Sequence, residues 1–112
     1  MKRIDKLKQN WEFRRLYSRG KCEVTEAFIL YFAKGKQGRV RLGITAGKKI
    51  GSAVKRNRAK RVLTAAFDSC LPDIKKGFDF CMVARGRVLA LKSTEVAKLL
   101  KRKLSENGLI QI

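Results

Sequence analysis

Residues 47–67 read GKKIGSAVKRNRAKRVLTAAF, and this stretch decides the fold. After Ser52, apolar residues recur at intervals of three and four, the spacing of one stripe on an α-helix. The stripe consists of Ala59, Val62, Leu63, Ala66, Phe67 and Cys70. Ser52 is a residue type that caps helix N-termini. The stretch also holds seven Lys or Arg and no Asp or Glu. We therefore expect a helix that buries this stripe and exposes Asn57, Arg58, Lys60, Arg61 and Thr64 on its opposite side.

The charge of the whole chain predicts a polyanionic partner. Its 112 residues include 28 Lys or Arg against 9 Asp or Glu, a formal net charge of +19. A hydrophobic content of 45% is enough for a core, so we expect one folded domain over residues 1–112. Residues 27–67 contain eleven basic side chains and no acidic one. Because a solvated face normally mixes the two signs, this region predicts a binding surface.

The composition argues against a self-contained enzyme. There is no histidine, which removes the usual acid–base group and the Ser–His nucleophile. The nine carboxylates are scattered, whereas a two-metal nuclease needs them clustered. The run from Gly43 through Gly47 to Lys48 and Lys49 looks like a phosphate-binding loop, but it is one residue short and lacks the following Ser or Thr. We expect no nucleotide and no small-molecule substrate.

The cysteines and the hydropathy indicate a cytoplasmic protein. Cys22, Cys70 and Cys81 form no CxxC pair, and reduced thiols in a reducing cytosol are the expected state. No apolar run approaches the length of a membrane span, and residues 1–10 lack the apolar core of a secretion signal. No membrane partner is expected.

The pattern of elements predicts an α+β sandwich in the order α-β-β-α-β-α. Residues 1–9 are expected to form a loose basic arm, and Asn10 to cap a helix that Gly20 ends. Residues 24–33 are predicted as one strand, with Val24, Phe28, Leu30 and Phe32 on one face and Thr25, Ala27, Ile29 and Tyr31 on the other. Residues 39–46 are predicted as a second strand that forms an antiparallel hairpin with the first.

Beyond the basic helix, Leu71 and Pro72 should stop the chain from continuing as a helix. A third strand is expected over residues 78–85, so the basic helix would connect the second and third strands as a parallel crossover. A last helix, capped by Ser93, is expected over residues 93–104, with an apolar side formed by Val96, Leu99, Leu100 and Leu104.

Cations beside aromatic residues are typical of a surface for single-stranded RNA. The basic helix offers Arg56, Arg58, Lys60 and Arg61 to phosphates, and Asn57 can both donate and accept hydrogen bonds. Phe13, Tyr17 and Tyr31 would stack on unpaired bases if they are exposed. The alternatives are a solvated helix face for the cations and, for Phe13 and Tyr17, packing in the core, which the helical spacing by itself favours.

The run from Lys48 to Arg61, KKIGSAVKRNRAKR, closely resembles the signature of the protein subunit of bacterial ribonuclease P, the ribonucleoprotein that removes the 5′ leader of precursor tRNA. The likeness continues in the same order and spacing at NWEF (residues 10–13) with Tyr17 and Gly20, at FILY (residues 28–31) and at RLGI (residues 41–44). It covers roughly residues 6 to 104.

The resemblance implies a left-handed β-α-β crossover of the kind found in a ribosomal protein domain, although general rules favour a right-handed one. It implies a non-catalytic subunit, with the RNA performing the cleavage together with Mg²⁺. One surface would face the ribonuclease P RNA through Lys48, Lys49, Arg56, Asn57, Arg58, Lys60 and Arg61. A cleft that includes Phe13, Tyr17 and Tyr31 would hold the 5′ leader, which raises a binding role for these aromatics above the core role. The chain has Thr64 where many relatives carry another Arg.

Two other classes remain alternatives. A purely structural RNA binder, such as a ribosomal protein, has the same composition but needs no exposed aromatic residues. A protein-only nuclease would cleave RNA without an RNA subunit, for which the scattered carboxylates give little support.

Overall fold

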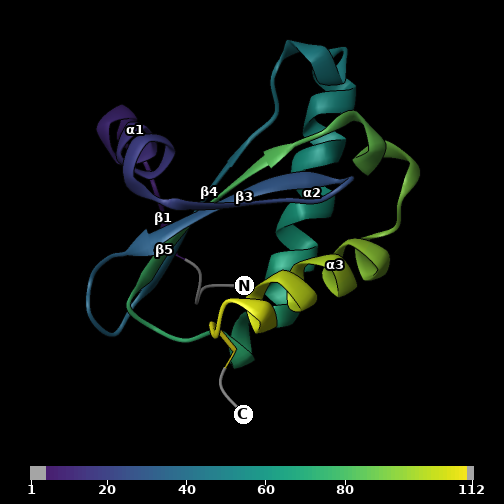
Figure 1. Cartoon of the computed structure of the whole chain (residues 1–112). Coiled ribbons are helices and arrows are strands. Elements are labelled where there is room, and N and C mark those ends of the chain that lie inside the picture. Colours follow the sequence, from purple (N-terminus) through teal and green to yellow (C-terminus); the bar gives the residue numbers. More distant parts are fainter. Residues whose placement is uncertain (1–4, 111–112) are drawn as a thin grey trace.

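The computed structural model describes residues 5–110. Within that range, three α-helices flank a five-stranded mixed sheet with the strand order β1-β4-β5-β3-β2 (Figure 1). The elements are β1 (Asp5–Lys6), α1 (Asn10–Arg19), β2 (Lys21–Val24), β3 (Phe28–Lys34), β4 (Val40–Thr45), α2 (Ala53–Cys70), β5 (Phe78–Ala84) and α3 (Ser93–Glu106). The predicted α+β sandwich is confirmed.

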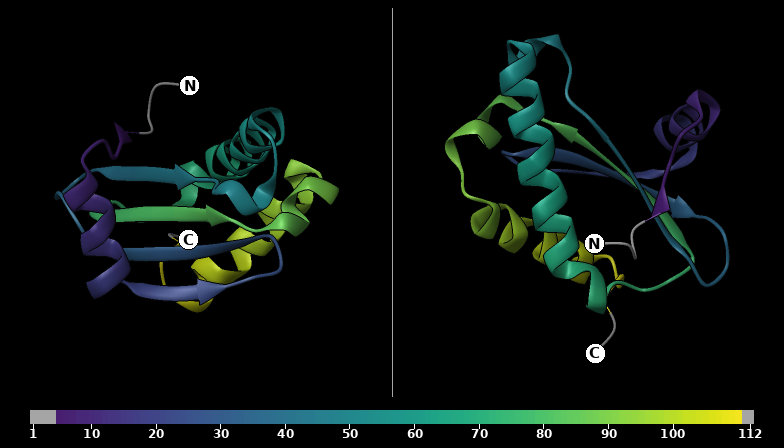
Figure 2. Two further views of the ribbon diagram at one scale, coloured as in Figure 1. Left: turned by 90° about the horizontal axis from the view of Figure 1, so that it is seen from above. Right: turned by 180° about the vertical axis from the view of Figure 1, so that it is seen from behind.

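The two faces of the sheet are covered differently. Helices α2 and α3 lie on one face and α1 crosses the other, as the two views of Figure 2 show. The larger core lies under α2 and α3, where the rings of Phe67 and Phe80 meet edge to face at 5.5 Å. A smaller cluster under α1 contains Leu7, Leu16 and Cys81. None of the three cysteines is paired in a disulfide: Cys22 is exposed, whereas Cys70 and Cys81 are buried.

Helix α2 forms as its sequence predicts. The whole apolar stripe belongs to the larger core, with Val62 half-buried and the others buried. The Ser52 hydroxyl caps the helix by accepting a hydrogen bond from the Lys55 N–H at 3.3 Å. The helix ends at Cys70, and Leu71–Asp73 follows as a 3₁₀ turn. The opposite face of α2 is therefore turned to solvent by the burial of the stripe.

The prediction of one strand over residues 24–33 is wrong, because the segment is divided between β2 and β3. Thr25 makes the turn: its hydroxyl accepts hydrogen bonds from the N–H groups of Ala27 at 3.2 Å and Phe28 at 3.0 Å. Val24, expected on the core face with Phe28, is 53% exposed on β2. Side chains that bond to a nearby backbone compete with strand pairing, and here that competition ends the strand.

The predicted antiparallel hairpin between the first strand (residues 24–33) and the second strand (residues 39–46) is also wrong. Strand β5 lies between β3 and β4, antiparallel to β3 and parallel to β4. Most side chains of β5 are buried on both faces of the sheet, which suits a central position. The parallel connection from β4 through α2 to β5 is confirmed, and its left-handed sense stays a prediction from the resemblance.

The N-terminal segment is more ordered than a loose arm. Asp5 and Lys6 pair parallel with β4 as β1, and Leu7 is only 6% exposed. Residues 1–4, also assigned to the arm, lie outside the described residues. The helix caps are displaced by one residue from those predicted, to Gln9 for α1 and Lys92 for α3. Gly20 ends α1 as expected, and α3 runs two residues beyond its predicted end.

Candidate nucleic-acid interface

The polar side of α2 and the turn before it form an exposed cationic face. We define this face by Lys48, Lys49, Arg56, Asn57, Arg58, Lys60 and Arg61. All are exposed except Arg56, which is half-buried. Within residues 5–110, none of these side chains takes part in an ion pair. The cationic face is thus available to an external anion, as the sequence predicted, rather than neutralised by the protein's own acids.

Glycine fixes the backbone just before α2. Gly51 has a φ of 132°, a conformation that other residues rarely adopt, and a Cβ there would lie 2.8 Å from Cδ of Lys55. It connects the 3₁₀ turn Lys48–Ile50 to the cap at Ser52, while Ile50 is buried in the core. Lys48 and Lys49 consequently precede the N-terminus of α2, where the helix dipole favours an anion.

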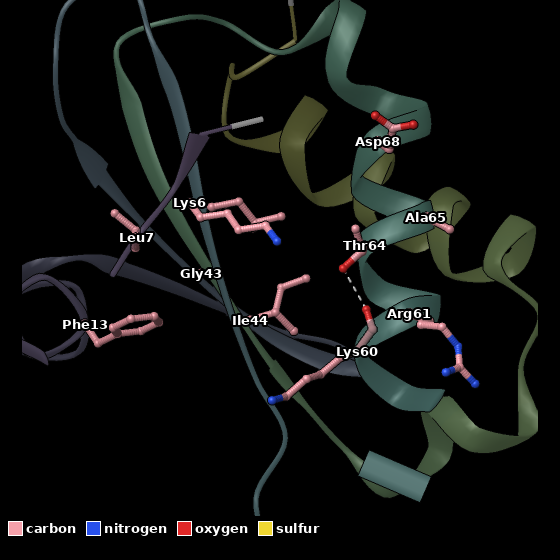
Figure 3. Close-up of a pocket in the computed structure, with 11 residues that line it drawn as sticks. Lys6, Leu7, Phe13, Gly43, Ile44, Lys60, Arg61, Thr64, Ala65 and Asp68 are labelled. Carbon is pink, nitrogen blue, oxygen red and sulfur yellow. Dashed lines mark hydrogen bonds between the residues drawn. The ribbon is translucent and has the colours of Figure 1, made fainter. Parts of the chain in front are cut away.

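A groove runs between α2 and the β1–β4 edge of the sheet, with a volume of about 690 Å³ (Figure 3). Its lining combines apolar side chains from the sheet side with Lys6, Lys60 and Arg61. Thr64 lies on its wall and donates its hydroxyl hydrogen bond to the Lys60 carbonyl at 2.8 Å (Figure 3). Position 64 therefore presents a hydroxyl and no cation to the groove.

Phe13 connects this groove to a second hollow. That hollow is lined by Asn10, Phe13, Arg14, Tyr17 and Thr45 and has a volume of about 440 Å³. Phe13 is half-buried and lies against Gly43, where a Cβ would come within 2.3 Å of the ring. Its ring therefore contributes to the core under α1 and to both depressions.

The two tyrosines lie together beside Phe13. Tyr17 is 41% exposed, and its ring meets that of Tyr31 edge to face at 4.9 Å. Tyr31 is half-buried, packs against the small cluster and lines neither depression. Desolvation and a hydrogen bond to the Cys81 thiol, at 3.6 Å, raise the pKa of Tyr17 to about 12. The structure thus brings Phe13 and Tyr17 together at the hollow, with the Tyr31 ring in contact with that of Tyr17.

Four charged side chains interact between α1 and the sheet, and the sequence did not predict this interaction. Asp79 on β5 is fully buried and accepts two hydrogen bonds from Arg41 on β4, both at 2.8 Å, and one from Arg15 on α1. Arg41 also donates to Glu12 at 2.7 Å. We call Glu12, Arg15, Arg41 and Asp79 the charge network. The feature of the sequence that could have indicated this network is Asp79, an acidic residue within the otherwise apolar strand β5.

Backbone hydrogen bonds also bind this network to the start of α1. The Glu12 carboxylate accepts from the N–H groups of Lys8 at 3.1 Å and Gln9 at 3.0 Å. The bond from Gln9, with further contributions from Lys8 and Arg41, lowers the pKa of Glu12 despite its burial. Hydrogen bonding to Asp79 raises the pKa of Arg41, so this guanidinium stays charged. The network therefore fixes α1, and with it Phe13 and Tyr17, to β4 and β5.

Neither a metal cluster nor a membrane span is apparent in residues 5–110. No three Asp, Glu, Cys or His side chains in this range come close enough together to hold a metal ion. No helix in the same range is both long and apolar enough to cross a membrane.

Comparison with known proteins gives one consistent result. The family model "Ribonuclease P" matches residues 1–107. A ribonuclease P protein component from Oceanobacillus iheyensis is 36% identical over 112 residues, covering 99% of this chain and 93% of that protein. The solved RNase P protein of Staphylococcus aureus superposes with a TM-score of 0.80 at 27% identity, covering 95% of this chain and 97% of that one. The RNase P protein of Thermotoga maritima gives the same TM-score and identity, with 91% and 96% covered.

Proposed function

The chain belongs to the ribonuclease P protein family, and we propose that it is the non-catalytic protein subunit of a ribonuclease P that removes the 5′ leader of precursor tRNA. The RNA subunit would carry out the phosphodiester hydrolysis. The observation that carries the proposal is the continuity of the exposed cationic face, the groove and the hollow beside Tyr17. Cations and aromatic rings along one path suit a single RNA strand read with little sequence preference.

The cationic face is assigned to the ribonuclease P RNA. Its side chains have no acidic partner within residues 5–110, so each can neutralise a phosphate and release counterions. Arg58 and Arg61 are exposed near the middle of α2 and are best placed for this. Asn57, between two arginines, can bond to a ribose hydroxyl or a base edge.

The groove and the hollow are assigned to the 5′ leader. Phe13 and Tyr17 offer ring surfaces there, and Arg14 in the hollow and Lys60 in the groove add charge for the backbone. Mature tRNA lacks the leader, so these contacts would strengthen binding of precursor over mature tRNA. Stacking on an aromatic side chain contributes roughly 1–3 kcal/mol per base.

Mg²⁺ is the metal that the family implies for the holoenzyme. Residues 5–110 bring no three metal-binding side chains together, so the donor set of this chain does not fit a protein-held magnesium site. The metal is therefore expected to be chiefly RNA-bound. The protein would lower the Mg²⁺ concentration required by offsetting phosphate repulsion with its own cations.

Reconstitution tests the proposal. The chain is mixed with a bacterial ribonuclease P RNA at low Mg²⁺, and leader cleavage from precursor tRNA is compared with that by the RNA alone. We expect a large gain in rate, and no gain would reject the assignment. Cleavage by the purified chain without RNA would instead indicate a protein nuclease.

Matched variants separate the two surfaces. Tyr17→Ala should weaken binding of precursor tRNA but not of mature tRNA to the holoenzyme. Arg58→Ala should weaken assembly with the RNA subunit, whereas Arg87→Ala, an exposed arginine already paired with Glu26 at 3.4 Å, should not. Equal affinities for precursor and mature tRNA would favour a structural RNA binder without a leader site.

A further inference from the structure

The outer side of α1 carries a large aromatic side chain that the fold does not use. Trp11 is the single tryptophan of the chain and is 57% exposed. It lies about 140° around the helix from Leu16, which is fully buried against the sheet. Most large aromatic side chains are extensively buried, and tryptophan is enriched in interfaces because its ring is apolar and its N–H can still donate. The ring is therefore available for contact with a partner.

The surroundings of Trp11 are positive and polar. Asn10, Arg14 and Ser18 are exposed around it, and Arg14 lies one turn away on the same side. Arg14 forms no ion pair with any residue between 5 and 110. The one acid of α1, Glu12, is buried and bonded to Arg41. This positive charge attracts a polyanion such as a nucleic acid and repels a cationic protein surface.

The same side chains connect Trp11 to the hollow. Asn10 and Arg14 line the hollow together with Phe13 and Tyr17, and both also flank Trp11 on the helix. At 100° per residue, Arg14 lies between Tyr17 and Trp11 around the helix, so a strand that left the hollow past Arg14 would meet the indole next. Its ring and the adjacent guanidinium form the combination of stacking surface and phosphate contact that single-strand binding proteins use.

We propose that Trp11 stacks on a nucleotide of the 5′ leader that lies beyond those contacting Phe13 and Tyr17, with Arg14 contacting the intervening phosphate. This rests on the proposed function and extends it. The chain would then discriminate among precursors by leader length, because only a leader long enough to leave the hollow gains the contact.

The experiment uses the holoenzyme and precursor tRNAs whose leaders are lengthened one nucleotide at a time. The chain has a single tryptophan, so its fluorescence reports on this site alone. We expect quenching to begin at a threshold length and Trp11→Ala to lose about fivefold in affinity above that length. Below the threshold the variant should match the parent protein, and Trp11→Phe should retain most of the gain.

Val24→Ala is the matched control, because it truncates another exposed apolar side chain, 53% exposed on β2. A Trp11→Ala affinity that is independent of leader length, while Tyr17→Ala still weakens precursor binding, overturns this inference alone. If Tyr17→Ala also leaves precursor binding unchanged, the assignment of the groove and the hollow to the 5′ leader is rejected. An effect of Trp11→Ala on self-association or on binding of the RNA subunit would assign the ring to another partner and would equally overturn the inference.

Discussion

Asp79→Asn is the most informative single change in this fold, because it removes one charge from the charge network and keeps the shape of the side chain. Asp79 is fully buried, and its carboxylate accepts two hydrogen bonds of 2.8 Å from the Arg41 guanidinium. Breaking a buried pair by removing one partner typically costs about 3–5 kcal/mol, since the remaining charge stays desolvated. Because Arg41 keeps its hydrogen bond to Glu12, we expect the free energy of unfolding to fall by the lower end of this range, about 3 kcal/mol.

A loss of that size is a large part of the roughly 5–15 kcal/mol by which small domains are stable. Urea unfolding followed by circular dichroism measures it as a lower midpoint with an unchanged slope. Asp5→Asn is the control, because it breaks the exposed Arg39–Asp5 pair at 2.7 Å, where less than about 1 kcal/mol is expected. If Asp79→Asn costs no more than Asp5→Asn, the network does not fix α1 to the sheet and the reasoning fails.

Three further outcomes follow from the same structure. Replacing the exposed Arg58 by Ala should flatten the dependence of RNA affinity on salt by about one unit of log–log slope, and an unchanged slope would mean that it contacts no phosphate. At neutral pH an alkylating reagent should modify exposed Cys22 well before buried Cys81, whose pKa is raised to about 11 by burial; equal rates would contradict the burial. Because the folded pKa of Glu12 is below its ordinary 4.5, its contribution to stability is complete above that pH and is lost as the pH falls through the folded value. Glu12→Gln should therefore unfold more easily at neutral pH and show a smaller further loss in acid, as measured by urea midpoints across that range.

Local periodicity was enough to predict the helices and the face that each one buries. The stripe of α2 lies in the core as expected, and burial of the apolar side of α3 at Val96, Leu100 and Leu104 follows the same rule. Such patterns repeat within a few residues and need no knowledge of distant partners. The cationic face follows directly, since it is what remains of α2 once the stripe is buried.

Strand pairing was not predictable in the same way. Two successive strands with a short turn suggested a hairpin, but the turn residues do not encode which strand comes between them. The nearly continuous apolar sequence of β5, FDFCMVA, was the better indicator of its central position, and it outweighs proximity in sequence. The division at Thr25 depended on a side-chain hydroxyl bonding to two backbone N–H groups, which an alternation of apolar residues does not reveal.

The position of Phe13 shows why the candidate site could be only partly predicted. Helical spacing placed Phe13 and Tyr17 on one face of α1, yet it offered core and binding surface as exclusive choices. In the structure the Phe13 ring occupies the space that a Cβ at Gly43 would fill, and it also lines both the groove and the hollow. That arrangement requires β4 to present a glycine at the point where the charge network brings α1 down on the sheet. A single ring can therefore be packed on one side and available for stacking on the other, because the contact that fixes it is made between segments thirty residues apart in the chain.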